Sequence, residues 1–547
     1  TIYRVGAVVL QKERMLVSFE PRVLIRYTLL ESSSPTTLRF RPFLAFRSVN
    51  ELTHENPIAS SNMDECENGR YNQMYANFPN LYMQFSKAIQ YTHNPQWYKG
   101  IEYIKERDRG YDYKEDLLVP GYFELPIKKG ESIIFSAGIT ECKTSTLKGT
   151  WKKELGRRIS REDMFSTLKN SAGQFYKREG DKCYLLAGYP WFQADARTTF
   201  FSVASCTLDI DRAEYWDAII NKTAIPEVLD FMNGRTEGIK MTGMDEPDVL
   251  LWFIRAIQKF AHKYSLREAA DLYGQLCADI ITYYRKQNHP RALLHRNGLI
   301  WVDGIKRPAT WMNATENGWP INPRTGYVVE INALWYNAML FTAEMLREMG
   351  KETSADLMEY QANIAKDAFV KTFWNGVYLY DFVINDYADK EVRPNMIWAV
   401  GLPFSPLDKR QQKAVVDICT KELLTPRGLR SLSPKSGHYR PMYYGNQVER
   451  DRSLHNGVVW PSTIAAYSRA YMQVYKHSGV AFMERALIGY EQEMSELCIG
   501  TLNEFYDGNP PYKGHGGMSA AASVASVISI LDTLKKYNNE QGKEDQQ

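Results

Sequence analysis

The spacing of apolar residues changes once along this chain, and that change constrains the fold more than any other feature. Up to about residue 140, apolar and polar side chains alternate in short segments such as VLIRYTL at 23–29, and Asn, Pro and Gly separate the segments. Alternation with a period of two and frequent turns is typical of antiparallel sheets. We therefore predict a β-sandwich over residues 1–140.

Beyond residue 185 the apolar residues recur at helical spacing instead. In EINALWYNAMLFTAEMLREMG, for example, Ile331, Leu334 and Ala338 occupy positions i, i+3 and i+7 of one face. Polar loops rich in Gly, Pro, Trp and Asn separate successive helix pairs. Helix pairs with functional loops at one end predict an (α/α)6 toroid of about twelve helices.

The domain boundaries follow from the same patterns. Residues 141–180 are charged and helical in period, and we predict a linker helix there. The helical domain is then expected over residues 181–536. The polar end of the chain, residues 537–547, is predicted to be a disordered tail.

The composition excludes several functional classes. A net charge of +3 gives no electrostatic reason to expect nucleic acid or an acidic membrane as a partner. No run approaches the roughly 18 apolar residues of a membrane span. The seven cysteines are widely spaced without a CxxC pair, which favours reduced thiols over disulfides or structural zinc. We therefore expect a cytoplasmic protein.

The chain also lacks the short motifs of cofactor binding. It has no phosphate loop, no dinucleotide glycine fingerprint and no HExxH. The glycine-rich GHGGMS at 514–519 lacks both the lysine and the preceding strand of a phosphate loop. We expect no cofactor and no metal.

Aromatic residues are the one unusual part of the composition. They make up 13% of the chain, with 35 Tyr and 12 Trp. Aromatic faces stack well on the C–H faces of sugar rings, although large cores use aromatics too. Composition alone therefore leaves sugar binding and core packing both open.

Four loops of the helical region concentrate side chains that suit carbohydrate chemistry. In sequence order they are AGYPWFQADART (187–198), GMDEPDVLLWF (243–253), TWMNATENGWPINPRTGYVVEINALWYNA (310–338) and GTLNEFYDGNPPYKGHGG (500–517). Glu504, in the last loop, is a carboxylate among aromatic residues and suits a general base. The alternative for Glu504 is a solvated loop acid, and for Asp248 in the second loop it is helix capping.

Five motifs occur in a fixed order: GYPWF, TWMN…PRTGYVVEINALWYNA, GLRSLSP, SLHNGVVWP and LNEFYDG. Together they resemble the glucosidase part of glycogen debranching enzymes, the amylo-α-1,6-glucosidase family. Upstream, KGIEYIKERDRGYDYKEDLLVPGYFELPI is similar to the sandwich domain that precedes it in bacterial and archaeal members. The resemblance covers nearly the whole chain, and it implies that the front of the sandwich is missing, because the chain opens at TIYRVG.

The resemblance implies a fold and a reaction. The family combines a β-sandwich with an (α/α)6 barrel and hydrolyses the α-1,6-linked glucose at glycogen branch points with inversion. Inverting glycosidases need two carboxyl groups, roughly 6.5–9.5 Å apart, one as acid and one as base. Glu504 matches the family's base, and an α-glucan or related oligosaccharide is the expected partner.

The acid position departs from the family. The family motif reads Thr-Trp-Met-Asp, whereas this chain has Asn313 at the last position. A carboxamide cannot donate a proton as an acid does. Two further family motifs, Trp-Gly-Arg-Asp and Gln-Ala-Trp-Ser, are replaced here by residues 195–198 (Asp, Ala, Arg, Thr) and 520–523 (Ala, Ala, Ala, Ser). The expected activity is therefore impaired or altered, unless Glu316 or Asp248 supplies the proton. The alternative is a catalytically inactive glycan-binding protein on the same scaffold.

Other residues of the motifs are expected to bind the substrate. The predicted set comprises Trp191, Asp195, Arg197, Asp248, Trp311, Glu316, Arg324, Glu330, Trp335, His455 and Trp460. Each tryptophan taken alone has core packing as its alternative, and Glu330, which opens a helix, has capping as its alternative. A packed core histidine is the alternative for His455.

Overall fold

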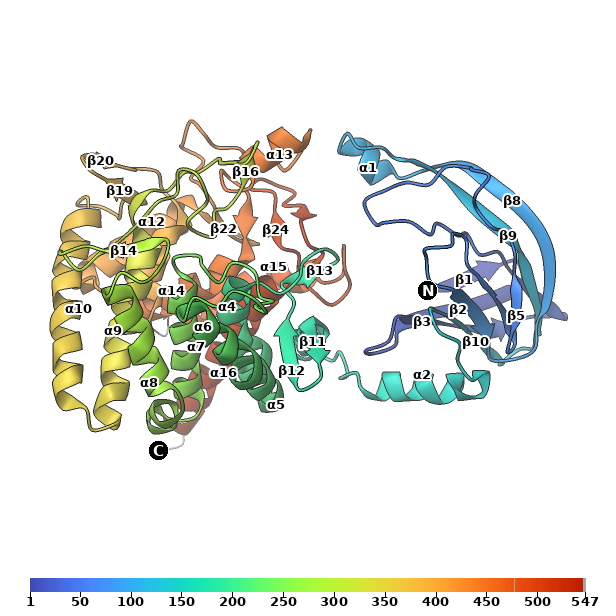
Figure 1. Cartoon of the computed structure of the whole chain (residues 1–547), viewed down its shortest axis with the longest axis horizontal. Helices are drawn as coiled ribbons and strands as arrows, with labels where there is room; N and C mark the ends of the chain where they lie inside the picture. Colours follow the sequence, from blue (N-terminus) through green and yellow to red (C-terminus); the bar gives the residue numbers. More distant parts are fainter. Residues whose placement is uncertain (477, 545–547) are drawn as a thin grey trace. The chain divides into compact units, whose positions relative to one another are not determined.

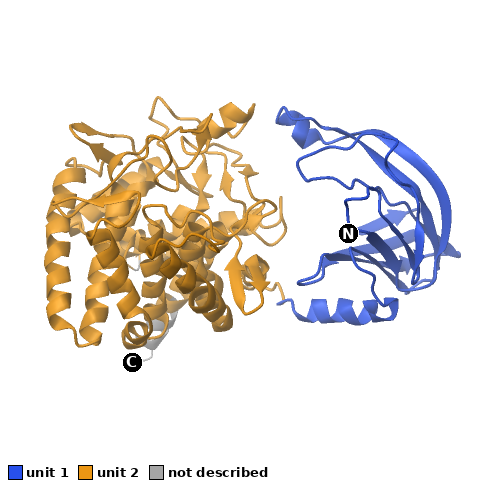
Figure 2. Ribbon diagram, viewed as in Figure 1, with its two compact units in different colours: residues 1–159 blue, residues 160–547 orange. Residues whose placement is uncertain are grey.

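The structure is a computed structural model that describes residues 1–476 and 478–544. The chain forms two compact units, residues 1–159 and 160–547 (Figure 2). The division falls inside the segment 141–180 that we predicted as a linker. That segment contains two helices, α2 (Leu147–Gly156) in unit 1 and α3 (Met164–Ala172) in unit 2.

Unit 1 consists mainly of two antiparallel sheets. The strand order is β1-β2-β3-β10-β7-β6-β5 in the larger sheet and β4-β9-β8 in the smaller. The strands are β1 (Ile2–Val5), β2 (Val8–Leu16), β3 (Arg22–Glu31), β4 (Thr36–Phe40), β5 (Asp64–Cys66), β6 (Gly69–Asn72), β7 (Leu81–Phe85), β8 (Gln90–Glu102), β9 (Lys114–Ile127) and β10 (Ser132–Gly138). A short helix, α1 (Ile104–Asp108), joins β8 to β9, and a 3-10 turn, η1 (Thr144–Thr146), precedes α2.

Both sheets of unit 1 bury apolar side chains in one core. The larger sheet contributes Leu29 and Ile133, and β9 of the smaller sheet contributes Phe123 and Leu125; none of them is more than 1% exposed. Phe123 and Leu125 are two residues apart and therefore point to the same face of the sheet. The N-terminal sandwich predicted from the alternating pattern is confirmed.

Six helices of unit 2 close an inner ring. Along the chain α4 packs on α7, α7 on α9, α9 on α11, α11 on α14 and α14 on α16, and α16 packs back on α4. The ring consists of α4 (Ala196–Thr207), α7 (Val249–Lys263), α9 (Val329–Glu348), α11 (Trp398–Gly401), α14 (Ile464–Tyr475) and α16 (Ala521–Glu544). This closed ring is the core of the predicted (α/α)6 toroid.

Outer helices pack around the ring. Helix α8 lies against α7 and α9, α10 against α9, α12 against α11 and α14, and α15 against α14 and α16. In Figure 1 the long helices α8, α9 and α10 run side by side. The further helices of unit 2 are α5 (Ala213–Trp216), α6 (Ile225–Met232), α8 (Leu266–Arg285), α10 (Glu352–Phe373), α12 (Lys409–Glu422), α13 (Gln447–Ser453) and α15 (Ser478–Glu493), with a π-helix η4 (Asp217–Ala224) and 3-10 turns η2 (Gly173–Phe175), η3 (Leu208–Ile210), η5 (Pro394–Ile397) and η6 (Pro461–Thr463).

Short antiparallel strands in the loops gather at one end of the helices, the upper end of unit 2 in Figure 1. They are β13 (Gly188–Tyr189), β14 (Ala292–Leu294), β15 (Ile300–Val302), β16 (Thr315–Glu316), β17 (Trp319–Pro320), β18 (Gly326–Val328), β19 (Phe382–Ile384), β20 (Tyr387–Ala388), β21 (Leu424–Thr425), β22 (Gly428–Arg430), β23 (Val459–Trp460), β24 (Phe505–Tyr506), β25 (Gly514–His515) and β26 (Ser519–Ala520). A separate hairpin comprises β11 (Tyr176–Glu179) and β12 (Lys182–Leu185). Within the described part of unit 2, parallel pairing is limited to one isolated bridge between Asp195 and Thr242.

The end of the chain continues the last inner helix. Helix α16 runs to Glu544, through most of the segment 537–547 that we predicted as a disordered tail, and residues 545–547 lie outside the described residues. Among the described residues, none of the helices combines the length and apolar character that crossing a bilayer requires.

Candidate active site

A cavity of about 350 Å³ opens where the six inner helices begin. Its volume lies within the range of small-ligand sites, about 300–1,000 Å³. The residues from the inner helices and the turns that start them are Arg197, Thr198, Phe201, Asp248, Trp252, Glu330, Trp398, Ser462, Thr463, Ala520, Ala522 and Ser523. The residues from the connecting loops are Ala187, Phe192, Asp195, Trp311, Asn313, Trp460 and Glu504.

Aromatic rings form much of the cavity wall. Trp252 packs edge to face on Phe201 at 5.3 Å and on Trp398 at 4.9 Å between ring centroids. Trp311 meets Trp460 in the same way at 5.5 Å. Each ring thereby fixes the orientation of the next, as edge-to-face aromatic pairs do. The result is a rigid apolar surface of the kind that accepts the face of a pyranose ring.

Glu504 brings a carboxyl group into this apolar wall. It precedes β24, and its Oε2 accepts a hydrogen bond of 2.9 Å from the backbone N–H of Gly517. Burial raises the pKa of Glu504 to about 7, against the opposing effect of that hydrogen bond, and the charge of Asp195 raises it further. The neighbouring Gly516 has φ +71°, and a Cβ there would collide with Glu504 Oε2. The glycine-rich loop GHGG therefore leaves the space that this carboxyl group occupies.

Asn313 reaches the same cavity from a loop held by its backbone. Its N–H donates to Trp311 O at 3.0 Å and to His455 Nε2 at 3.2 Å. No side chain or backbone group of the described residues forms a hydrogen bond with its side-chain amide, which is exposed to the cavity. Donor and acceptor atoms of the amide are thus available to a ligand.

Arg197 and Asp248 form a charged pair in the cavity wall. Arg197 Nε and Nη2 donate to the two carboxylate oxygens of Asp248 at 2.9 and 2.7 Å, and Nη2 also pairs with Glu246. Burial lowers the pKa of Arg197, but Asp248 and Glu246 raise it by more, so the guanidinium stays charged. Trp252 Nε1 donates to Asp248 as well, at 3.0 Å. The pair thereby orients a wall tryptophan.

Asp195 combines a structural and a local electrostatic role. It caps α4 by accepting a hydrogen bond of 2.8 Å from the backbone N–H of Thr198. Burial raises the pKa of Asp195. Its carboxyl group lies near enough to Glu504 to affect the pKa of Glu504, so two acidic groups share this side of the cavity.

The family of the chain follows from comparison with known proteins. The family model described as amylo-alpha-1,6-glucosidase matches residues 169–529, the part that forms the ring and the cavity. The chain belongs to the amylo-α-1,6-glucosidase family. A second model, described as glycogen debranching enzyme N terminal, matches residues 1–134. The resemblance drawn from the motifs is thereby confirmed, and family membership identifies the chain as a glycoside hydrolase of the debranching type.

Solved structures support the same fold. A crystal structure of a bacterial glucoamylase complexed with acarbose matches with a TM-score of 0.56 at 11% sequence identity, and the match covers 97% of this chain and 82% of that chain. At this identity the likeness is evidence for the fold. No curated protein gives a significant match to the chain.

Arg324 differs from its predicted role in sugar binding. It is 3% exposed and does not line the cavity. Its Nε and Nη2 donate to Asp381 at 2.6 and 2.9 Å, its Nη2 donates to Glu330 at 2.7 Å, and its Nη1 pairs with Glu330 and Thr310. With every nitrogen engaged, Arg324 holds Glu330 in the cavity wall instead of contacting a ligand.

The same network extends to a wall tryptophan. Asp381 accepts a hydrogen bond of 2.7 Å from Asn395 Nδ2, and Asn395 Oδ1 accepts one of 2.8 Å from Trp311 Nε1. Trp311 is therefore oriented by a buried polar chain that starts at Arg324. Buried polar networks whose members are all satisfied rigidify the groups they hold.

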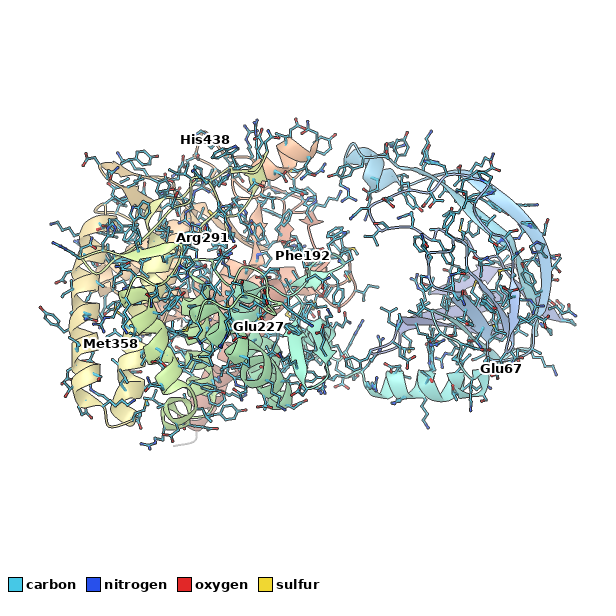
Figure 3. All side chains as sticks on the ribbon, viewed as in Figure 1. Glu67, Phe192, Glu227, Arg291, Met358 and His438 are labelled. Carbon is cyan, nitrogen blue, oxygen red and sulfur yellow. The ribbon has the colours of Figure 1, made fainter. Side chains whose placement is uncertain are left out.

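Three further predictions of substrate-binding residues, for two tryptophans and one glutamate, also need correction. These three residues lie outside the cavity. Trp335 is 1% exposed, and its Nε1 donates to Gly298 O at 3.0 Å, so it is a core residue of α9. Trp191 is 51% exposed, and its neighbour Phe192, labelled in Figure 3, lines the cavity instead. Glu316 lies in a separate depression and forms a bidentate pair with Arg452 at 2.7 Å.

His455 supports the cavity from behind. It is 1% exposed, stacks on Trp460 at 5.1 Å and meets Trp311 edge to face at 5.3 Å. Burial, together with the positive charges of Arg393 and Arg324, lowers the pKa of His455 to about 3. The imidazole is therefore neutral and serves as an acceptor for Asn313.

Sequence reasoning missed part of the wall. Phe201 and Trp398 lie on inner helices, where their spacing fits an ordinary core face. Trp252 belongs to the apolar run VLLWFI, whose composition is that of an ordinary buried helix turn. A signal was present for Trp252, because it stands four residues after Asp248 and therefore on the same face of α7. Nothing in the local sequence marks Trp398.

Proposed function

We propose that the chain removes α-1,6-linked glucose from an α-glucan by inverting hydrolysis, at a reduced rate on natural substrates. The observation that carries this proposal is Glu504, a carboxyl group with a pKa of about 7 in an aromatic cavity large enough for a sugar ring. In the proposed step Glu504 accepts a proton from water while the water oxygen attacks the anomeric carbon. The glycosidic C–O bond breaks, and the leaving oxygen must gain a proton.

The geometry of Glu504 supports the role of general base. One oxygen is held by Gly517, and its other oxygen receives no hydrogen bond from the described residues. A pKa near 7 leaves a large fraction ionised at neutral pH and keeps the carboxylate basic enough to accept a proton. The fixed backbone contact orients the free oxygen before substrate arrives.

Proton donation is the weak step of this proposal. Asn313 can donate a hydrogen bond to the leaving oxygen but cannot transfer a proton. The other carboxyl groups of the wall are engaged. Arg197 and Trp252 bind Asp248, Arg324 binds Glu330, and the backbone N–H of Thr198 donates to Asp195. Side-chain hydrogen bonding to Arg452 lowers the pKa of Glu316, which makes it a poor acid as well as a distant one. Water must then protonate the leaving oxygen, so substrates with poor leaving groups should react slowly.

A second candidate function is glycan binding without turnover. The observation that favours it is that Thr198, Asn313 and Ala522 line the cavity at positions where the family motifs have Asp, Asp and Trp. A cavity with aromatic walls and an unpartnered amide can hold a sugar without reacting with it.

A limit dextrin distinguishes the two candidates. Incubation with purified protein should release glucose, and proton NMR should show the β anomer first, because inversion converts an α linkage into β-glucose. Glu504→Gln is the matched control and should release none. Glucose release that persists in this variant would contradict the assignment of the base. Saturable binding of the dextrin by calorimetry, with no glucose released, would favour the second candidate.

A further inference from the structure

A second, smaller cavity lies deeper in the ring of inner helices. Its volume is about 20 Å³, and it shares Phe201, Trp252 and Trp398 with the active-site cavity, so these rings form the partition between the two. The remaining residues belong to the same inner helices and are Phe200, Ser205, Arg255, Ala256, Lys259, Ala465, Arg469, Ala525, Ser526 and Ser529. No carboxylate is among the residues that line it.

Three cationic side chains line this cavity without a counter-charge at contact distance. Arg255 is 6% exposed, and its one side-chain hydrogen bond to the described residues joins Nη1 to Gln258 Oε1 at 3.2 Å. Lys259 Nζ donates to Ser205 Oγ at 2.9 Å, and Arg469 donates to Gly401 O and Ser529 Oγ at 3.1 and 3.3 Å. Within residues 1–476 and 478–544, none of the three forms an ion pair.

The nearby negative charge does not balance these cations. Asp209 is the acidic group that acts on all three, and it accepts a hydrogen bond from Ser205 Oγ at 2.9 Å. Three positive charges and one negative charge leave an excess of two. Burial lowers the pKa of Lys259 to about 8 and that of Arg255 to about 9. Buried charges without partners are costly, and proteins retain them where an ion or ligand neutralises them.

We propose that this cavity binds one small monovalent anion, chloride under ordinary conditions. A cavity needs about 10–15 Å³ to hold a water molecule, so a volume of about 20 Å³ admits a single small ion and excludes phosphate or sulfate. Nε and Nη2 of Arg255 have no partner within the described residues, and the hydroxyl proton of Ser529 has no acceptor there. The anion site does not depend on the proposed glycosidase reaction.

The occupant is tested by exchanging the anion at constant ionic strength. Melting of the whole protein is followed in chloride, in bromide and in isethionate, which is too large for the cavity. Chloride and bromide should raise Tm by at least about 2 °C in a saturable manner, because a ligand that binds only the folded state stabilises it. A crystal soaked in bromide should give an anomalous peak between Arg255 and Lys259. A cavity without that peak overturns the proposal, whatever the melting curves show.

Substitutions at the cavity test whether the halide that raises Tm binds there. Lys259→Met removes one cation and should abolish the halide-dependent rise in Tm while retaining the fold. Lys263→Met is the matched control on the same helix, where Lys263 pairs with Asp211 outside the cavity. It should keep the full rise. If Lys259→Met does not fold, Ser529→Ala removes a neutral donor instead. This variant should need at least a threefold higher halide concentration to reach half of the rise in Tm. If the halide-dependent rise in Tm is unchanged in every folded variant, the halide binds elsewhere and the proposal is overturned.

Discussion

The backbone N–H of Asn313 donates a hydrogen bond of 3.2 Å to Nε2 of His455. Because burial lowers the pKa of His455 to about 3, its imidazole is a neutral acceptor near neutral pH. The position of residue 313 is thus set by its backbone and by a buried histidine. A different side chain at 313 should therefore occupy the same place in the cavity.

Asn313→Asp should increase kcat/KM on a natural α-glucan about 10²–10⁴-fold, because a carboxyl group in this place can protonate the leaving oxygen. On an activated aryl α-glucoside, whose leaving group needs little protonation, the gain should stay below about tenfold. Initial rates on both substrates measure the difference.

Asn317→Asp is the control for the added charge. Asn317 lies on the exposed turn between β16 and β17, with φ 51°, outside the active-site cavity. The variant Asn317→Asp should leave the hydrolysis rates on both substrates unchanged. If Asn313→Asp yields no gain, the substitutions at Thr198 and Ala522 have already removed the subsite, and glycan binding becomes the better account. Fast wild-type hydrolysis that Asn313→Ala does not affect would contradict the assignment of the acid position.

The rate of hydrolysis should depend on pH through Glu504. A general base works in its ionised form, and the pKa of Glu504 is about 7. We expect kcat/KM on the activated glucoside to rise between about pH 6 and 8 and then to level off. A profile that is flat across this range would exclude Glu504 as the base.

Glu504 should also cost stability when it is ionised. Its folded pKa lies above the ordinary carboxyl value, so the folded state binds the proton more tightly than the unfolded state. Its contribution to stability is present below about pH 4.5 and is lost as pH rises through about 7. Glu504→Gln should therefore raise the free energy of unfolding by about 1–3 kcal/mol at pH 8 and by little at pH 4. Urea unfolding at both pH values tests this; an equal effect at both would mean that charge is not the cause.

Arg324→Met should destabilise the protein by about 3–5 kcal/mol, because it leaves Glu330 and Asp381 buried without their counter-charge. Arg452→Met breaks the exposed pair with Glu316 and should cost less than about 1 kcal/mol. Denaturant unfolding compares the two variants. Unchanged stability together with a raised KM in Arg324→Met would instead restore the sugar-binding role that the sequence suggested.

Glu316→Gln should leave kcat and KM on limit dextrin within about twofold of wild type, because Glu316 lies outside the cavity and its carboxylate is bound to Arg452. A loss of about 10²-fold or more would identify it as the missing acid and would require the loop from Trp311 to Trp319 to move on binding.

Much of the fold could be predicted from local patterns, and part of the site could not. Leu29 and Phe123 in the sandwich, and Ile331 and Leu334 on α9, are buried as their spacing indicated. The role of Arg324 could be read only in part from its motif, because its partner Glu330 lies in that motif but its second partner, Asp381, lies 57 residues away on the chain. A local motif shows which groups are present but does not show which groups neutralise them.

The sequence by itself determined the succession of sandwich and helical toroid, because side-chain periods of 2 and 3.6 are properties of neighbouring residues. Its motifs also predicted that Glu504 and Asn313 belong to one site, and both residues line the same cavity. The tertiary structure alone decided that six inner helices bring their first turns to one cavity. It also decided that three cations, which form no ion pair with the described residues, lie behind the aromatic partition of that cavity. These features depend on closing the ring between α16 and α4, and contacts across some 300 residues of chain leave no periodic trace in the sequence.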